Sequence, residues 1–182
     1  MKLETNRLTV RNFVKADASD LYEILGDAET MKYCEQPYDF EKTKNFLNEF
    51  CIAREGAAAA VHKQSGKVIG YILFNEYTGN VYEMGWFFNQ KFWKQGYAYE
   101  ACQAVIDYAF AKLHAHKIFA ETIDPVKSVA LMKKLGMQLE GMQRSHVKDL
   151  TGRWSDLYLY GLLGEDLQQY QKNCDNMTYT TR

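Results

Sequence analysis

The sequence is poor in proline, has no closely spaced cysteines and carries almost no net charge. Its 182 residues include two prolines and four cysteines, and 22 basic against 23 acidic side chains leave a formal net charge of −1. A charge this small argues against a protein that holds nucleic acid through a strong positive field. No apolar run approaches the roughly 20 residues needed to cross a bilayer. We therefore expect neither a nucleic-acid partner nor a membrane partner.

Motifs for metal and redox chemistry are also missing. No two cysteines have the C-x-x-C spacing of a zinc ribbon or a redox pair, and the histidines fall on different predicted elements. We expect no bound metal and interpret the thiols as small buried hydrophobic groups. The cysteines are Cys34, Cys51, Cys102 and Cys174, and the histidines are His62, His114, His116 and His146.

The remaining composition is that of one globular domain. A hydrophobic content of 47% is ordinary for a folded chain, and the length fits a single domain over residues 1–182. The first residues show no basic start followed by an apolar run, so we expect no signal peptide and a cytoplasmic location. Residues 174–182 are predicted to form a frayed tail.

Apolar periodicity predicts the elements of a mixed α/β (α+β) fold. Apolar residues at helical spacing predict an amphipathic helix over residues 97–113, and shorter apolar or alternating runs predict strands. The sheet is predicted to be largely antiparallel, with about seven strands and about four flanking helices. The predicted strands cover residues 8–13, 57–62, 68–77, 80–88, 117–123, 137–146 and 155–163, and the predicted helices cover residues 17–26, 40–53, 97–113 and 128–135, with a short last helix at 165–170.

The junction between the strand that ends at Phe88 and the helix that begins near Tyr97 is a candidate anion site. The first amides of a helix have no acceptor inside the helix, and the helix dipole places partial positive charge there. Gly96 allows close approach of a ligand to the backbone, and Lys91 and Lys94 add positive charge. A pyrophosphate would fit such a helix end, although a glycine that only permits a turn gives the same pattern.

Several motifs in order resemble those of the GNAT N-acetyltransferase superfamily, in particular its ribosomal-protein N-acetyltransferase (RimJ/RimL-like) branch. The family pattern Q/R-x-x-G-x-G/A, often written out as G-K-G-Y-A-T-E-A, is matched at the junction by residues 94–101, K-Q-G-Y-A-Y-E-A. Further matches are T-N-R-L at residues 5–8, E-M-G-W at residues 83–86, K-L-G-M at residues 134–137 and G-R-W-S-D at residues 152–156. The resemblance covers about residues 3–167, and it implies a GNAT fold whose central sheet splays open.

The resemblance also implies an acetyl-CoA site and direct transfer of an acetyl group to a primary amine in a ternary complex. Main-chain groups of Phe87 and Phe88 would pair with the pantetheine arm, and the backbone of the following loop would hold the pyrophosphate. Trp93 stands at the Q/R position of the motif. A cofactor-binding asparagine of the family is missing, either because Pro125 takes its place or because the loop is two residues shorter. The cofactor-binding residues implied by the family pattern are Phe87, Phe88, Trp93, Lys94, Gln95, Gly96, Tyr97, Ala98, Lys127 and Ser128.

Amine acetylation needs a base for the amine proton and benefits from an acid for the leaving thiolate. By resemblance, Glu83 is the candidate base and Ser128 the candidate acid; the alternatives are a plain strand carboxylate and a helix N-cap. Met132 occupies the position where many relatives carry a proton-donating tyrosine. Three tyrosines, Tyr97, Tyr158 and Tyr160, remain spare candidates for that role.

Two questions about function stay open in the sequence. The alternative to an enzyme is a non-catalytic CoA-binding or interaction module on the same fold. The acceptor is either a protein N-terminal α-amine or a small-molecule amine. The oligomeric state is also open, with a homodimer as one candidate. Acidic residues of the first helices could attract a cationic amine or form a solvated face; they are Glu29, Glu35, Asp39 and Glu41.

Overall fold

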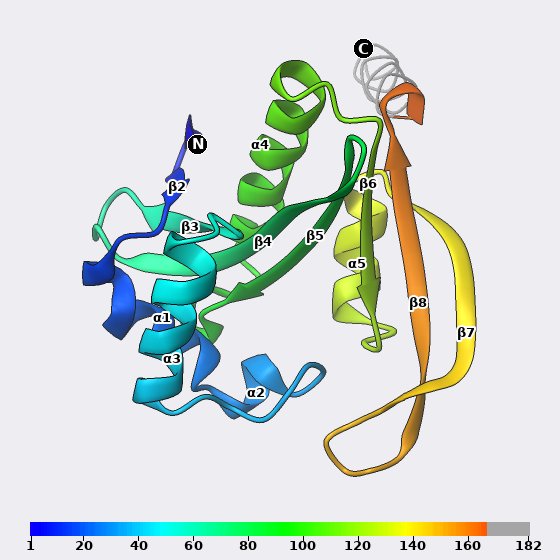
Figure 1. The fold of residues 1–182 in the computed structure, drawn as a ribbon, viewed down its shortest axis with the longest axis horizontal. Coiled ribbons are helices and arrows are strands. Elements are labelled where there is room, and N and C mark those ends of the chain that lie inside the picture. The colour runs from blue at the N-terminus through cyan, green and yellow to red at the C-terminus, as the bar shows by residue number, and fades with distance from the viewer. Residues whose placement is uncertain (167–182) are drawn as a thin grey trace, which may run out of the picture.

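Eight strands form one sheet in the computed structural model, which describes residues 1–166 (Figure 1). The strands lie in the order β1-β2-β3-β4-β5-β6-β8-β7, and all neighbours are antiparallel except β5 and β6. The predicted mixed α/β fold with a largely antiparallel sheet is thus confirmed. The strands are β1 (Lys2–Glu4), β2 (Leu8–Asn12), β3 (Ala57–His62), β4 (Val68–Thr78), β5 (Val81–Phe88), β6 (Lys117–Thr122), β7 (Gln138–Lys148) and β8 (Trp154–Leu163).

Helices cover both faces of the sheet. The helices α4 and α5 pack on one face, and α1, α2 and α3 pack on the other. Each face of the sheet has its own hydrophobic core, the α4 core and the α1–α3 core. Side chains of β3 alternate between them: Ala58 and Ala60 enter the α4 core, whereas Ala57 and Ala59 enter the α1–α3 core. The helices are α1 (Ala18–Leu25), α2 (Ala28–Met31), α3 (Phe40–Phe46), α4 (Tyr97–Lys112) and α5 (Lys127–Lys134).

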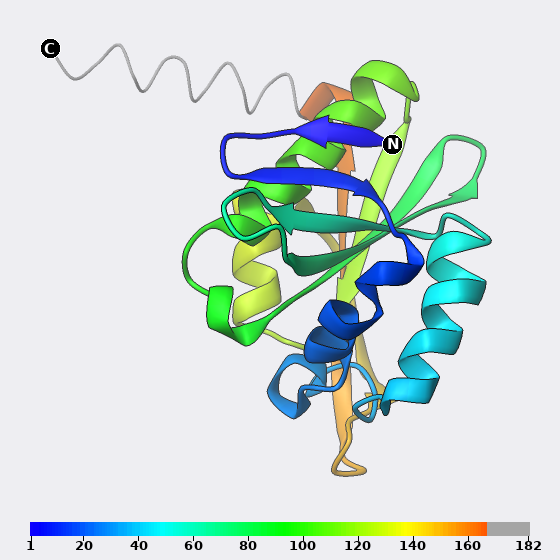
Figure 2. The same ribbon diagram turned by 90° about the vertical axis from the view of Figure 1, so that its left-hand side faces the viewer.

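The first hairpin lies beside α4, as Figure 2 shows. Strands β1 and β2 pair from Lys2 opposite Arg11 to Glu4 opposite Thr9, and both strands contact α4. Strand β1 is one of two additions to the predicted strands and α-helices, since three residues are too few to show a period in the sequence. The other addition is the single-turn helix α2, whose first turn is capped by the Asp27 side chain.

Some predicted boundaries differ from the structure. The predicted helix over residues 40–53 is divided, because the hydrogen bonds after α3 widen to a π-helical turn at Leu47–Ile52. The predicted last helix at 165–170 and the tail at 174–182 lie largely or wholly outside the described residues. Among residues 1–166, no helix combines the length and the apolar character that crossing a membrane requires.

The cysteines divide between the core and the surface. Cys51 and Cys102 are buried, as predicted, and burial raises the pKa of both thiols. Cys34 is exposed instead, because it follows α2 in the segment that leads to α3. Cys174 lies outside the described residues. The burial of Cys102 in the α4 core agrees with a structural role for this thiol.

Candidate active site

The sheet opens where β5 and β6 part. These parallel strands are joined by α4, and their pairing runs only from Val81 opposite Lys117 to Glu83 opposite Phe119. Beyond Glu83, no described strand pairs with that side of β5, whereas β6 stays paired with β8 as far as Thr122. Figure 1 shows the two strands diverging from this point. We refer to the space between residues 84–88 of β5 and β6 as the gap.

Alternation along β5 decides which backbone groups face the gap. The Asn89 amide donates to the Ile69 carbonyl over 2.9 Å, so alternate residues such as Phe87 direct their backbone groups toward β4. The backbone groups of Trp86 and Phe88 therefore face the gap. The geometry agrees with the predicted backbone role of Phe88 in the gap. It favours Trp86, and not Phe87, as the second residue whose backbone faces the gap. The side chain of Phe87 lies instead on the α1–α3 face, 5.8 Å from the Tyr71 ring.

At one end of the gap lies the beginning of α4. Gly96 precedes the helix in a left-handed conformation with φ of 83°, and Lys94 also has a positive φ of 59°. No side chain caps this helix end. The first-turn amides, including those of Tyr97 and Ala98, have no acceptor within the helix. The structure therefore gathers the predicted residues 94–98 around one positively polarised helix end.

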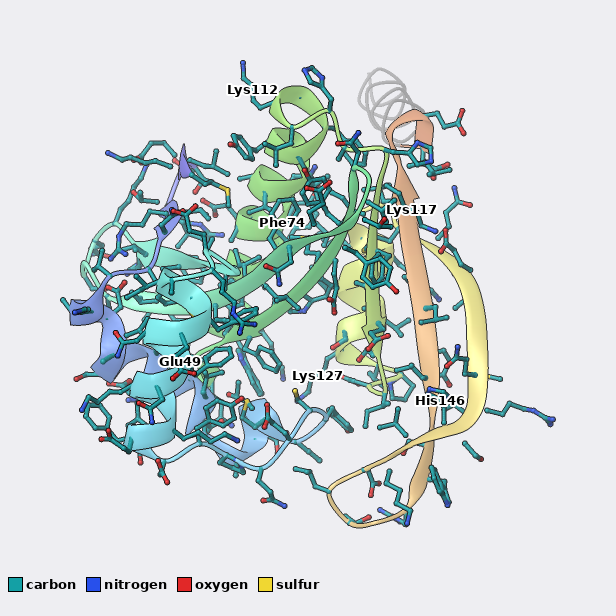
Figure 3. The ribbon with its side chains drawn as sticks, in the orientation of Figure 1. Glu49, Phe74, Lys112, Lys117, Lys127 and His146 are labelled. Carbon is teal, nitrogen blue, oxygen red and sulfur yellow. The ribbon has the colours of Figure 1, made fainter. Side chains whose placement is uncertain are left out.

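Trp93, in the loop between β5 and α4, lies beside the gap. The Trp93 indole Nε1 donates to the Phe88 carbonyl over 2.6 Å, which ties the loop to the end of β5. Across the gap, the Lys127 ammonium lies 4.5 Å from the centre of the Trp93 ring and 3.3 Å from Glu29. Figure 3 shows Lys127 reaching from α5 toward β5. Lys127 thus links three segments at the mouth of the gap, through exposed and therefore individually weak contacts.

The N-terminal segment fastens the start of α4. Glu100 accepts hydrogen bonds from the Thr5 hydroxyl, the Arg7 amide and the Arg7 Nε, each 2.7 Å long. Arg7 also donates through Nη1 to the Gln95 carbonyl over 2.9 Å, and its guanidinium lies 4.2 Å from the centre of the Tyr97 ring. Burial raises the pKa of Glu100, but these hydrogen bonds outweigh burial and the pKa is lowered overall. Glu100 is therefore a firmly ionised anchor.

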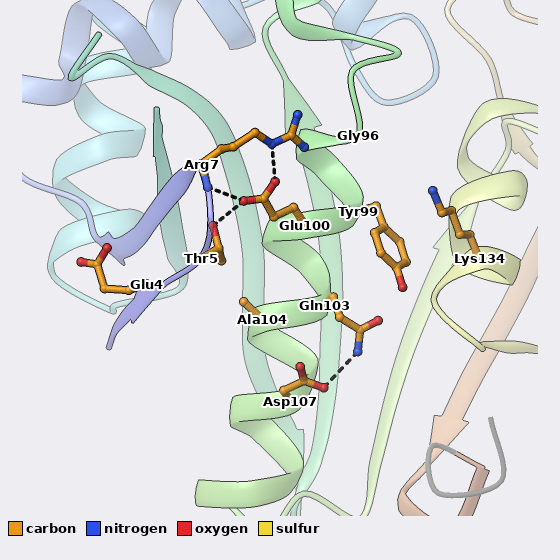
Figure 4. Close-up of a pocket in the computed structure, with 10 residues that line it drawn as sticks. All are labelled: Glu4, Thr5, Arg7, Gly96, Tyr99, Glu100, Gln103, Ala104, Asp107 and Lys134. Atoms are coloured by element: carbon orange, nitrogen blue, oxygen red, sulfur yellow. Dashed lines mark hydrogen bonds and ion pairs between the residues drawn. The ribbon is translucent and has the colours of Figure 1, made fainter. Parts of the chain in front are cut away.

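An open surface groove of about 570 Å³, called the cavity below, begins at Gly96 and follows the outer face of α4 (Figure 4). The first hairpin forms one wall through Thr5 and Arg7. Tyr99 and Lys134 form the opposite wall, with the Lys134 ammonium 4.4 Å from the centre of the Tyr99 ring. A ligand in this cavity would therefore lie between an arginine and a lysine, next to the helix end.

Glu83 lies at the vertex where the gap closes. Its side chain is half-buried, and within residues 1–166 it takes part in no hydrogen bond or ion pair. Burial raises the pKa of the Glu83 carboxyl, and the negative charge of Glu121 on the same face of β6 raises it further. A half-buried carboxylate with a raised pKa and no partner is suited to accept a proton.

Tyr71 is a second unpaired polar group on the Glu83 face. It lies on β4 opposite Phe87, its ring contacts Phe13 and Phe46, and only 4% of the residue is exposed. No described residue hydrogen-bonds to its hydroxyl. Burial raises the pKa of Tyr71, with smaller effects from neighbours that include Glu83. The hydroxyl therefore stays protonated and available as a donor.

The loop before α5 is organised by Asp124 rather than by Ser128. The buried Asp124 carboxylate accepts the amides of Val126, Lys127 and Ser128 over 2.9, 3.1 and 3.2 Å. The Ser128 hydroxyl donates to the same carboxylate over 3.5 Å, longer than an ordinary O–H···O bond. The amides at this helix start are thus already occupied by a carboxylate, and Ser128 does not act as the N-cap.

The other tyrosines considered as proton donors have structural environments. The Tyr97 hydroxyl lies 3.2 Å from His62 Nε2, Tyr160 is buried in the α4 core, and Tyr158 lies opposite Thr122. Met132 is buried as well. None of these side chains is directed by a described contact toward Glu83.

The acidic residues of the first helices are engaged by neighbours. Glu35 accepts from the Tyr38 hydroxyl over 2.6 Å and from Lys42, and Asp39 caps α3 through the Lys42 amide. Glu41 pairs with Lys44, and Glu29 pairs with Lys32 and Lys127. These contacts favour the interpretation of a solvated face over that of an amine-attracting cluster.

The sequence interpretation gave no role to Arg7, Asp124 or Tyr71. Arg7 stood inside a matched motif, but its contact with Glu100 joins residues 93 positions apart and leaves no local pattern. Asp124 did carry a usable signal, because an aspartate followed by a proline is typical of a helix start. Tyr71 lies in a continuous apolar run, and such a run does not indicate whether a hydroxyl within it has a hydrogen-bond partner.

Known proteins resemble this chain in sequence and in fold. A model of the acetyltransferase (GNAT) domain matches residues 7–138. The uncharacterized N-acetyltransferase YnaD of Bacillus subtilis (strain 168) is 34% identical over 170 residues, which cover 91% of this chain and 99% of that protein. A solved acetyltransferase (GNAT family) from Bacillus anthracis is 32% identical with a TM-score of 0.83, and the match covers 91% of this chain and 99% of that one.

A more distant solved structure shares the fold. It is the spermidine N-acetyltransferase of Vibrio cholerae in complex with CoA and spermine, with a TM-score of 0.78 at 21% identity, covering 89% of this chain and 98% of that one. Together with the parted strands and the uncapped helix end, the domain match and the two relatives above 30% identity lead to one conclusion. The chain belongs to the GNAT N-acetyltransferase family.

Proposed function

We propose that this acetyltransferase uses acetyl-CoA and moves the acetyl group directly to a primary amine in a ternary complex. The observation that carries the proposal is the parting of β5 and β6 at Glu83. It leaves an uncapped helix end at one end of the gap and an unpaired, half-buried carboxylate at the other. Family membership supports the same donor, and a neighbour of the same fold is described in complex with CoA.

The gap would hold the cofactor as an additional strand beside β5. Backbone groups of Trp86 and Phe88 would pair with the amides of the pantetheine arm. The amides of residues 94–98 would hold the pyrophosphate, which a helix N-terminus favours through free N–H groups and its dipole. Lys127, at the mouth of the gap, would add a positive charge in exchange for its contact with Glu29.

The chemistry needs a neutral amine, whereas free amines are largely protonated at neutral pH. Glu83 would accept the amine proton, directly or through water. The nitrogen lone pair then attacks the thioester carbonyl carbon, so that a C–N bond forms and the C–S bond breaks. The departing thiolate takes up a proton, for which Ser128 stays the predicted donor. Its long contact with Asp124 leaves its hydroxyl able to turn.

The amine acceptor is proposed only as a class. The T-N-R-L and G-R-W-S-D motifs resemble the ribosomal-protein branch and favour a protein N-terminal α-amine. A neighbour of the same fold is described as a spermidine N-acetyltransferase, which supports a small-molecule amine. In either case the carboxylates of Glu83 and Glu121 would attract a cationic acceptor to the vertex of the gap.

The proposal is tested by following thiol release from acetyl-CoA across peptides, polyamines and aminoglycosides. We expect acceptor-dependent release with at least one class. The Glu83→Gln variant should lower kcat by about 100-fold, as expected for loss of a general base, and leave the cofactor Kd nearly unchanged. Glu49→Gln, which changes an exposed carboxylate with no described partner, is the control. An unchanged rate for Glu83→Gln would remove Glu83 from the mechanism.

Met132, in place of a proton-donating tyrosine, supports one alternative, a non-catalytic module that binds CoA. The same assay separates the two functions. Cofactor binding without thiol release for any acceptor would favour the module, whereas turnover with any amine would exclude it.

A further inference from the structure

The guanidinium of Arg7 is held in place before any ligand binds. Its Nε contacts Glu100, its Nη1 donates to the Gln95 carbonyl, and its flat face lies over the Tyr97 ring. These three contacts fix both the position and the plane of the group. Nη2 is the remaining nitrogen, and it donates no hydrogen bond to any group within residues 1–166.

Nη2 faces the start of α4. A Cβ atom built on Gly96 would lie 3.4 Å from Arg7 Nη2, so this nitrogen is next to the backbone whose amides begin the helix. Arg7 and Gly96 also line the same cavity, as Figure 4 shows. An anion bound at the helix end would therefore meet a guanidinium donor whose orientation is already set, and such charge-assisted bonds are among the strongest polar contacts.

The carboxylates around the cavity already have partners, so they do not strongly oppose an anion near Arg7. Glu100 is neutralised by Arg7 and held by Thr5, and Glu4 pairs with Lys63 over 3.0 Å. Asp107 accepts from Gln103 at the far end of the cavity. The Lys134 side chain forms part of the opposite wall. The acidic groups nearest Gly96 are thus already paired with cations.

The residue at position 93 explains why a guanidinium from another segment matters here. Trp93 stands at the motif position where the family pattern has glutamine or arginine, and its indole is committed to the Phe88 carbonyl. This chain therefore lacks a polar side chain at that place in the loop. Arg7 brings a guanidinium to the same helix end from a distant segment.

We propose that Arg7 is a phosphate ligand of the cofactor, with Nη2 donating to the pyrophosphate held over Gly96. The inference rests on the proposed function, since it assumes that a CoA ester occupies the gap. In this role Arg7 does two things: it engages the Gln95 carbonyl through Nη1, and it adds an oriented guanidinium N–H donor that Trp93 does not supply. The first hairpin is then part of the cofactor site and not only of the sheet.

The test compares a ligand that carries phosphates with one that does not. Calorimetry measures the Kd of CoA, and ligand-observed NMR measures the Kd of pantetheine, for the unmodified chain and for Arg7→Met. We expect CoA to bind about 10- to 100-fold more weakly to the variant, the range for a lost hydrogen bond to a charged group. We expect the Kd of pantetheine to change less than about twofold, because no phosphate is involved.

A structural role alone would give a different result. If Arg7 only supports the fold, Arg7→Met weakens both ligands equally; if it only positions the loop through Glu100 and Gln95, Glu100→Gln weakens CoA as much as Arg7→Met. Either outcome overturns the inference, as does an unchanged Kd for CoA. Arg11→Met is the matched control, since Arg11 pairs with Asp17 over 2.8 Å on the same hairpin but does not line the cavity. It should leave both Kd values as they are.

A second variant covers the case in which Arg7→Met does not fold. Arg7→Lys keeps the positive charge but cannot reach Glu100, Gln95 and a phosphate together. It should weaken CoA several-fold and leave pantetheine binding unchanged; equal weakening of both ligands again overturns the inference. Failure of the unmodified chain to bind CoA would instead refute the proposed function itself, so the two failures are distinguishable.

Discussion

The two ends of the gap are built in opposite ways. At the Gly96 end, contacts of 2.7 Å join Thr5 and Arg7 to Glu100, and a hydrogen bond of 2.9 Å from Arg7 to the Gln95 carbonyl fastens the loop. At the Glu83 end, the Glu83 carboxyl and the Tyr71 hydroxyl have no described partner. The first end is preorganised, and the second keeps its polar groups available.

This difference indicates what each end can recognise. An anion site made of backbone amides depends on chain geometry and tolerates changes of side chain, so the tryptophan at position 93 is compatible with it. A site made of unpaired side chains depends on the identity of each residue. We therefore expect the donor to be shared across the family and the acceptor to be set by residues such as Glu83, Glu121 and Tyr71.

The largest effect is expected from Gly96→Glu, which attacks the preorganised end. The new carboxylate would enter the anion site at a backbone φ of 83° that side chains rarely adopt. We predict more than about a 100-fold loss of CoA affinity by calorimetry, since a misplaced charge opposes the phosphates. Gly66→Glu is the control, with a similar φ of 71° but open space around it. Equal losses in both variants would contradict the account.

Glu100→Gln loosens the same end without adding a charge. The carboxylate that accepts from Thr5 and Arg7 becomes an amide, so Arg7 loses its ionic partner. We predict about threefold to tenfold weaker CoA binding, because the loop is positioned less firmly. We also predict a lower melting temperature, because a hydrogen bond to a charged group contributes about 1.5–3 kcal/mol to stability. Glu41→Gln, at an exposed pair with Lys44, should change neither quantity. Full CoA affinity in Glu100→Gln would show that the contacts of Glu100 with Thr5 and Arg7 do not position the loop.

Glu121→Gln sharpens the comparison at the Glu83 end. Burial is the main cause of the raised Glu83 pKa, and the Glu121 charge contributes a smaller repulsion. Removing that charge lowers the Glu83 pKa, so the base stays ionised to lower pH. The acid limb of the kcat/KM profile should move to lower pH by less than about one unit. A shift to higher pH would contradict the assignment of this limb to Glu83.

The smallest effect is expected from Tyr71→Phe. Its hydroxyl has no described hydrogen-bond partner, so its removal leaves no other group unsatisfied. We predict a change in the free energy of unfolding within about 0.5 kcal/mol, measured by denaturant titration. A loss well above 1 kcal/mol would show that the hydroxyl is paired in solution and is not available to a ligand.

The sequence predicted elements with strong local periodicity. Strand β5, its loop and α4 were placed correctly because apolar spacing and Gly96 mark them within one stretch of chain. Contacts across the chain were not predictable in this way. The bond between Arg7 and Glu100 spans 93 positions, and nothing near either residue indicates the other.

The sequence left side-chain roles least determined. It offered a helix cap as the alternative to an acid role for Ser128, but the Asp124 carboxylate accepts the three amides at this helix start. The family resemblance implied a backbone role for Phe87. Which backbone groups of β5 face the gap is set by the pairing of β5 with β4, which the sequence does not show. The sequence did not show which partners the acidic residues of the first helices have. Asp39, for example, caps α3 through the Lys42 amide.

The most direct test of the central claim is a calorimetric titration of the unmodified chain with acetyl-CoA. The account predicts saturable binding of one cofactor per chain, because the gap offers one helix end and one free strand edge. The absence of binding heat up to millimolar acetyl-CoA, with the chain shown to be folded, would contradict it.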